Sequence, residues 1–362
     1  MTTADSRMSR VGFVLAATAS IVAEGLFVWP LHVVVAAGQN AILAVGITGG
    51  WTVAIALAHP AALPSVPRLR HAFRVLDILG WMVLGTVDTV MIVSLMAMLK
   101  TFYFFETPLW ALLLPFCAVV GWAAAKPRAT VNRLATFWVP ILFVGSLIVA
   151  LMAMSHIHYP RTLLPNQAVD GKAVVQATAV MAYMVAPVGL TLRGLATSVQ
   201  TPPTTAVRLW GPLLAWSFLL TLYLLLVGTL GPNALIHLRW PIVFMLDQIT
   251  LDSAFFISRV GIAVIFGWTL GIALGLIIHV DLIGESAQTQ WTHPATRGVV
   301  AGSVTCLWFF AALFTTTPAT ASRLLLSWLD PAAIGYLGIE AALLFIVAII
   351  RRTHTSKAKE SD

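Results

Sequence analysis

Three carboxylates stand inside long apolar stretches of the sequence, at Glu24, Asp88 and Glu340. Burying an acid in a bilayer costs roughly 2.5–3.5 kcal/mol, so such residues are candidates for function. Glu24 could accept the ammonium group of an amino acid or a proton, or it could cap free amides at a helix break. Asp88 either lines the same cavity or packs against a polar neighbour. Glu340 is expected to be structural, held against a neighbouring helix or protonated.

Glycine and proline interrupt two of these apolar stretches, at Gly25, Pro30, Pro187 and Gly189. Proline removes a backbone donor and clashes with the preceding turn of a helix. We therefore expect helical hydrogen bonding to be lost near Ala23–Gly25 and near Val185–Gly189. Interrupted helices at matching positions of two halves of a chain point to a substrate site, because a polar ligand can satisfy the freed backbone groups.

The elements that must position these residues are membrane helices. Only 10% of the residues are charged, 59% are hydrophobic and the mean hydropathy is +0.91. Soluble domains carry about 25% charged residues, and a membrane helix needs about 20 apolar residues in succession. Ten nearly charge-free blocks meet that pattern, at 11–35, 41–58, 78–99, 107–125, 134–155, 173–192, 209–230, 260–280, 298–318 and 331–350.

The ten blocks divide into five and five. An odd number of spans in each half makes the second half run through the membrane in the opposite sense, as in the inverted repeats of secondary transporters. The expected fold is all-α: a polytopic membrane protein of ten transmembrane helices whose first and sixth helices are interrupted. Residues 1–362 form a single integral membrane domain, with one repeat over 11–155, a second over 173–350 and short cytoplasmic tails.

Positive charge is unevenly distributed between the two sides of this arrangement. With the amino terminus inside, fifteen Lys and Arg residues fall on the cytoplasmic side and six on the other. Cytoplasmic loops carry the excess of basic residues, so both termini are predicted to be cytoplasmic. The formal net charge of +7 is therefore a topology signal, and nucleic acid is not an expected partner.

The sequence offers no support for an enzyme. It contains no nucleophile elbow, phosphate-binding loop, dinucleotide-binding glycine pattern or metalloprotease helix, so no catalytic residue is assigned. His156 and His158 lie close together, but a metal site would need further ligands nearby. Neither a metal nor a cofactor is expected.

Several stretches resemble those of a known family, the GerAB-type spore germination proteins. The stretches are Glu24-Gly25-Leu26-Phe27-Val28-Trp29-Pro30, Met98-Leu99-Lys100 through Phe105-Glu106-Thr107-Pro108, Arg239-Trp240-Pro241 followed by Ile257-Ser258-Arg259 and Trp268, and a last span that closes on Arg351-Arg352. Each is short, and their order and spacing cover nearly the whole chain.

The resemblance implies a fold, partners and a site. These proteins are the B subunits of nutrient germinant receptors, in the amino acid–polyamine–organocation (APC) superfamily. It implies A and C subunits as partners in the spore inner membrane, contact with membrane lipid, and a small nutrient, expected to be an amino acid. It also implies a pocket between the first, third, sixth and eighth spans. Carried onto this sequence, that pocket comprises Ala23, Glu24, Gly25, Val87, Asp88, Tyr183, Ala186, Pro187, Gly189 and Gly275.

The sequence departs from the family at three points that concern the ligand. Family members have a small residue at the position of Glu24 and an acid at the position of Ser258, and they often have an acid after the glycine of the sixth span. Two functions stay open: a receptor subunit that binds a germinant and signals to its partners, and a secondary amino-acid transporter coupled to protons or ions. The buried acid at Glu24 is compatible with both, because such acids also serve as proton relays.

Overall fold

A computed structural model of the chain describes residues 8–25, 29–58, 67–166, 168–199, 201–249, 260–288, 296–315 and 317–360. Within these ranges the chain is helical and forms no β-strand; one isolated bridge pairs Met8 with Val199. Parts of the family-like stretches, at 26–28 and 257–259, lie outside the described residues, as does Arg7.

Each of the ten apolar blocks coincides with one helix or with a broken helix. The first block corresponds to α1 (Arg10–Gly25) with α2 (Trp29–Ala37), and a 3-10 turn at Gly38–Asn40 follows α2. The second to fifth blocks correspond to α3 (Ala41–Ala58), α4 (Pro67–Phe102), α5 (Leu109–Ala124) and α6 (Arg128–Met154). The next four correspond to α7 (Gly171–Ala179) with α8 (Ala182–Ala196), α9 (Thr205–Leu230), α12 (Val260–Gln288) and α13 (Thr296–Thr315). The last corresponds to α14 (Pro318–Leu324), a π-helical turn at Leu325–Leu329 and α15 (Asp330–Glu360). Short helices occupy the connections, at Pro160–Leu163, α10 (Pro232–Leu235) and α11 (Pro241–Gln248).

The all-α membrane class is confirmed. Among the described residues, seven helices are long and apolar enough to cross a bilayer, or eight if the bent pair α7–α8 is one span. Helix α5 is apolar but shorter than these. The count of ten spans and the five-plus-five repeat therefore stay predictions.

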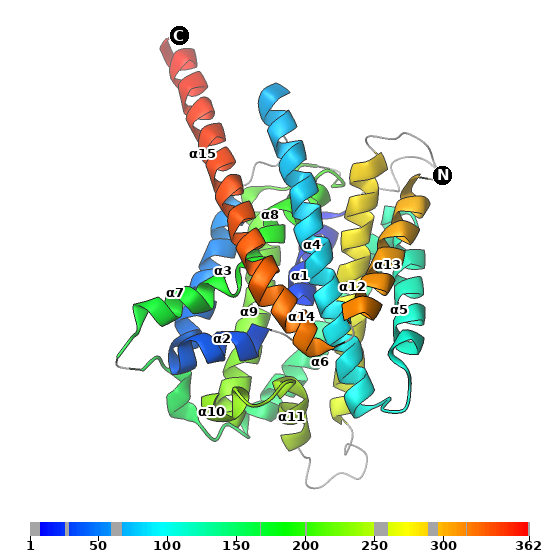
Figure 1. Cartoon of the computed structure of the whole chain (residues 1–362). Helices are drawn as coiled ribbons and strands as arrows, with labels where there is room; N and C mark the ends of the chain where they lie inside the picture. Colours follow the sequence, from blue (N-terminus) through cyan, green and yellow to red (C-terminus); the bar gives the residue numbers. More distant parts are fainter. Residues whose placement is uncertain are drawn as a thin grey trace.

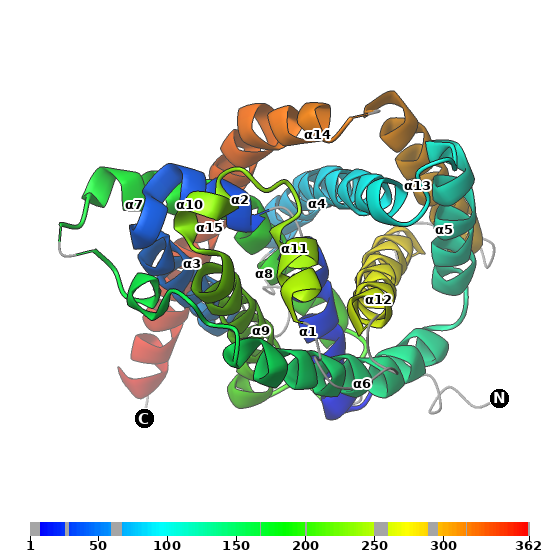
Figure 2. The same ribbon diagram turned by 90° about the horizontal axis from the view of Figure 1, so that it is seen from below.

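Helix α1 runs through the middle of the bundle. It packs against α12, α9, α6 and α8, and Figure 2 shows it between α9, α6 and α12. Large apolar side chains on the outer helices α5, α6, α13 and α15 are instead exposed, including Trp122, Phe137, Leu307, Phe314 and Phe345. An exposed apolar belt of this extent is what a lipid-facing surface requires.

The first apolar block contains two described helices, α1 and α2, and residues 26–28 between them lie outside the described ranges. Helix α1 stays helical to Gly25, so the predicted loss of helical structure at Ala23–Gly25 is wrong. Helix α2 begins at Trp29 and lies across the direction of α1 (Figure 1), where it packs against α3 and α7. Glu24 therefore belongs to the last turn of a helix that ends inside the bundle.

The sixth span is broken earlier than predicted. Helix α8 is continuous through Pro187 and Gly189, which contradicts the break expected at Val185–Gly189. The chain bends by 48° between α7 and α8, at Val180–Met181. Pro187 is accommodated inside α8, six residues beyond the bend, and α7 instead packs against α2 and α3. The bend places Tyr183 in the first turn of α8.

The N-terminal end of α4 and the C-terminal end of α15 project from the same face of the bundle (Figure 1). We call this the terminal face. Helix α1 begins there as well, with Met8 beside Val199 at the end of α8. Whether this face is cytoplasmic stays a prediction from the distribution of basic residues.

Candidate functional site

Four polar side chains meet at the centre of the bundle. His279 of α12 contacts Asp88 of α4 (Nδ1 to Oδ1, 2.9 Å) and Ser20 of α1 (Nε2 to Oγ, 2.6 Å). Its Nε2 atom also lies 3.6 Å from Glu24 Oε1. Each of the four side chains is at most 1% exposed. We call Ser20, Glu24, Asp88 and His279 the central cluster.

Helical geometry explains how α1 supplies two members. Ser20 and Glu24 stand four residues apart, and residues at that spacing lie on the same face of a helix, one turn from each other. That face is turned toward α12, the helix that carries His279. Glu24 of α1 and Asp88 of α4 approach the imidazole of His279 from two different helices.

The hydrogen-bonding capacity of this region is not fully used. Glu24 Oε2, Asp88 Oδ2 and the Tyr183 hydroxyl are buried and have no hydrogen-bond partner. A buried polar group without a partner costs about 1–3 kcal/mol, and more when it is charged. Three such groups on α1, α4 and α8 are what a polar ligand, a cation or a proton would satisfy.

The structure brings the predicted site residues together on four helices. Ala23, Glu24 and Gly25 lie on α1, Val87 and Asp88 on α4, Gly275 on α12, and the others on α8. These helices contact one another, and the described side chains of the set are buried. Val87, Ala186 and Pro187 offer apolar surface only.

Sequence reasoning missed His279 and Ser20. The search singled out carboxylates within the apolar blocks, whereas His279 is the ionisable imidazole of the eighth block, one residue from its end. An ionisable residue in a membrane span is a functional candidate whatever its type, so the same rule could have found it. Ser20 carries no such signal.

Gly275 is a point of close contact between α12 and α1. A Cβ atom built there would lie 2.3 Å from Ala23 Cβ and 2.9 Å from the Ala19 carbonyl oxygen. The room beside Gly275 is therefore taken by α1. The space beside Gly25 is similarly occupied, by the end of the Met184 side chain.

We expect Gly275→Ala to destabilise the protein by about 1–3 kcal/mol, because the methyl group overpacks a backbone contact. Thermal unfolding of the purified protein in detergent measures this. Gly267→Ala is the matched control on α12, since its Cβ would meet only Leu142 Cδ2 at 3.6 Å. Adding Ala23→Gly to Gly275→Ala removes the nearest clashing atom and should recover part of the loss. Equal stability of the two single variants would contradict the close contact.

Comparison with known families identifies the chain. Residues 74–287 match the profile of a family described as spore germination protein, over more than half of the sequence. The chain belongs to this family. No curated protein matches it. The matched stretch includes Asp88, Tyr183, Gly275 and His279, whereas Glu24 precedes it. The resemblance to the GerAB-type proteins is thereby confirmed.

An ion-pair network links three helices of this germination protein, and the segment that follows α8, at its terminal face. Arg128, at the start of α6, pairs with Asp281 of α12 (Nε to Oδ2, 2.7 Å) and with Glu285 one turn further on. Arg128 also donates to Ser198, just beyond α8, and Arg297 of α13 pairs with Asp281. The network joins α6, α12, α13 and the segment after α8, and its member Asp281 stands two residues after His279 of the central cluster. We call it the terminal-face network.

A second buried network holds Glu340. Arg193 of α8 pairs with Asp77 of α4 (2.5 Å) and with Glu340 of α15 (3.4 Å), and its guanidinium lies 5.4 Å from the centre of the Phe73 ring. These contacts join three helices and support the structural interpretation of Glu340.

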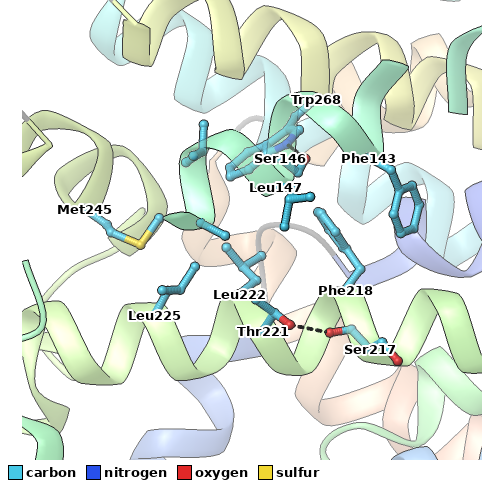
Figure 3. A pocket seen from close by; sticks show the side chains of 12 residues that line it. Phe143, Ser146, Leu147, Ser217, Phe218, Thr221, Leu222, Leu225, Met245 and Trp268 are labelled. Carbon is cyan, nitrogen blue, oxygen red and sulfur yellow. Dashed lines mark hydrogen bonds between the residues drawn. The ribbon is translucent and has the colours of Figure 1, made fainter. Parts of the chain in front are cut away.

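A cavity of the germination protein lies away from the central cluster. It has a volume of about 180 Å³ and lies between α6, α9, α11 and α12 (Figure 3). Phe143, Phe218, Leu222 and Trp268 line it, and Trp268 donates to Ser146 (3.0 Å). A neighbouring cavity of about 40 Å³ reaches Thr18 and Val22 of α1. Neither is lined by a predicted site residue, and both are largely apolar.

The histidines at 156 and 158 show no metal site. Within the described ranges no three His, Cys, Asp or Glu side chains gather in an arrangement that could hold a metal ion. His156 instead contacts Ser155 and the carbonyl oxygen of Met152.

Proposed function

We propose that this germination protein is a receptor subunit that binds a small amine-bearing nutrient, an amino acid in the simplest case, between α1, α4, α8 and α12. It passes the signal to A and C subunits in the spore inner membrane, with both of its termini in the cytoplasm. The observation that carries the proposal is the pair of unpartnered carboxylate oxygens, Glu24 Oε2 and Asp88 Oδ2, together with the unpartnered hydroxyl of Tyr183 on α8.

The chemistry of an amino acid matches these groups. An ammonium group has three N–H donors and no acceptor, and hydrogen bonds from a cation to a carboxylate are about twice as strong as neutral ones. Glu24 and Asp88 would each accept one. Helices α2 and α8 begin at the buried residues Trp29 and Ala182, and the first turn of a helix carries amides without intrahelical partners and partial positive charge. Such helix starts suit the carboxylate of the same ligand.

Ligand entry requires the bundle to open. The central cluster is buried and the space beside Gly275 is filled by α1, so binding needs α12 to move away from α1. The terminal-face network holds α12 against α6 and α13. A ligand that replaces the contacts between α1 and α12 therefore gives the protein two arrangements, and partner subunits can sense the difference.

A panel of nutrients tests the proposal through the thermal unfolding of the purified chain. Amino acids should stabilise it, by about 2.7 kcal/mol at a concentration one hundred times Kd. The matched deaminated acids, sugars and nucleosides should stabilise it far less, because they lack the ammonium group. Equal stabilisation by an amino acid and its deaminated analogue would contradict an ammonium site.

The transporter is the second candidate. The terminal-face network favours it, because a set of ion pairs that closes one end of the bundle can open when the other end closes, as alternating access demands. Uptake of labelled amino acid into proteoliposomes that contain the chain alone indicates a transporter. Binding without uptake, together with co-purification of A and C subunits, indicates a receptor subunit.

A further inference from the structure

The cavity between α6, α9, α11 and α12 has a buried floor and an open side. Met245 of α11 and Trp268 of α12 line it and are 0% and 5% exposed. Leu147 of α6 and Thr221 of α9 also line it, and both are exposed. Figure 3 shows Met245 at one end of the cavity and Phe143 at the other. The cavity of about 180 Å³ therefore opens on the side of the bundle, between α6 and α9.

The open side belongs to the lipid-facing belt. Val144, Ile148 and Leu151, which stand near Leu147 on α6, are each more than half exposed. Leu147 lies seven residues before the end of α6 at Met154, which is about 10 Å along the helix. Half of the hydrocarbon core of a bilayer is about 15 Å thick. The opening therefore faces the acyl chains of one leaflet, the one away from the terminal face, where α6 begins.

The walls of the cavity suit hydrocarbon. Trp268 donates to Ser146 Oγ (3.0 Å), the Thr221 hydroxyl donates to the Ser217 carbonyl oxygen (2.7 Å), and the Ser217 side chain is on the exposed rim. The other lining side chains are those of Phe, Leu, Val, Ala and Met. Apolar cavities of about 150 Å³ stay dry and bind a molecule of the size of benzene. A cavity of about 180 Å³ thus has room for about six carbon atoms of a chain.

The surrounding lipid is the nearest source of such a chain. An unfilled apolar cavity destabilises the structure around it, because its walls lose dispersion contacts. Lipid tails are as apolar as leucine, so a tail that enters gives up no favourable environment and restores these contacts. Acyl chains are also present at the opening at far higher concentration than any small apolar molecule in solution.

The site adjoins helix α1. The neighbouring cavity of about 40 Å³ shares Phe143 and Phe218 with it and reaches Ala19 of α1. The centres of the two phenylalanine rings lie 5.6 Å apart. Ala19 is also the residue whose carbonyl oxygen approaches Gly275 of α12. An occupant of the larger cavity therefore packs against side chains that border the contact between α1 and α12.

We propose that this cavity binds one acyl chain of a membrane phospholipid from the leaflet away from the terminal face. The chain enters between α6 and α9, its end lies against Trp268 and Met245, and its headgroup stays at the membrane surface. The bound chain fills the space between α6, α9 and α12 and supports the wall beside α1. The inference goes beyond nutrient binding and does not depend on it, because none of the described residues that line the cavity belongs to the central cluster.

Photolabelling with a lipid tests the site. The probe is a phosphatidylcholine that carries a diazirine near the end of one acyl chain, in nanodiscs that contain the purified full chain. Mass spectrometry locates the labelled residues after illumination. We expect label on Trp268 and Met245, because these buried side chains are reached from the bilayer only through the cavity.

Two variants block the cavity and one serves as the control. Ala150→Phe places a ring inside it and Ser217→Trp places one at its rim, so each should lower the labelling of Trp268 and Met245 at least tenfold. Val144→Phe adds the same ring on the lipid-facing side of α6, away from the cavity lining, and should leave the labelling unchanged.

The pattern in the wild type is decisive where a variant does not fold. Label confined to exposed residues of the belt, with none on Trp268 or Met245, would overturn the proposal, as would equal labelling of these two residues in both blocked variants. A second probe, the same diazirine on a free six-carbon alcohol, separates the two sources of hydrocarbon. Labelling of Trp268 and Met245 by the alcohol but not by the lipid would assign the cavity to small apolar molecules and also overturn the proposal.

Discussion

Replacing Glu24 by glutamine is expected to raise the Kd for amino acids about 30-fold or more. The substitution keeps the size of the side chain and removes its charge, and losing one partner of a buried charged hydrogen bond costs about 2–5 kcal/mol. Each 1.4 kcal/mol is a factor of about ten in affinity. Equilibrium binding of a labelled amino acid to the purified chain measures the change.

The matched control is Glu106→Gln, at an exposed residue of the loop between α4 and α5, and it should leave Kd unchanged. Any binding of neutral sugars or nucleosides should depend less on Glu24 than binding of amino acids does. An unaltered amino-acid Kd in Glu24→Gln would contradict the site and leave this carboxylate as a cap for free amides near the end of α1.

Arg128→Gln has the second large expected effect, a loss of about 3 kcal/mol in the free energy of unfolding. Removing one member of a buried ion pair costs about 3–5 kcal/mol, because it leaves an uncompensated charge. The lower end applies here, since Arg297 still pairs with Asp281. Thermal or denaturant unfolding in detergent measures it.

Two further variants show whether the loss comes from the ion pairs. Arg133→Gln changes an exposed arginine of the same helix and should stay within about 0.5 kcal/mol of the wild type. Combining Arg128→Gln with Glu285→Gln should cost less than the sum of the single changes, because the two side chains are partners. Strict additivity would argue against the ion pair.

The helical class follows from sequence because a bilayer imposes it. Long runs without charge must be helices where lipid surrounds them, since no water satisfies their backbone groups. That reasoning placed every helix of the bundle core. It also pointed to the sixth block as interrupted, since α7 and α8 are bent by 48° there, although neither predicted interruption site is broken.

The exact positions of the breaks could not be read from residue type. Pro187 is accommodated inside α8, and the bend falls at Val180–Met181, where neither proline nor glycine occurs. The location depends on how α7 packs against α2 and α3, which local sequence does not encode. The packing partner of Gly275 is hidden for the same reason, because its contact with Ala19 and Ala23 joins distant parts of the chain.

The polar residues of the interior were only partly recognisable. Glu24 and Asp88 stand out because acids are rare in apolar blocks, and the structure places them on the two sides of His279. Asp330 lies one residue before the last apolar block, 331–350, and its position next to Pro331 is typical of a loop. In the structure it is nevertheless buried. Arg193 is one of the fifteen basic residues that the charge distribution predicts on the cytoplasmic side, but it lies inside a buried network.

The most direct measurement of the nutrient site is a structure of the purified chain with the best-stabilising amino acid bound. The ammonium group is expected within hydrogen-bonding distance of Glu24 Oε2 and Asp88 Oδ2, next to Tyr183, with α12 moved away from α1 at Gly275. A ligand found in the cavity lined by Phe218 and Trp268, with the central cluster unchanged, would contradict the proposed site.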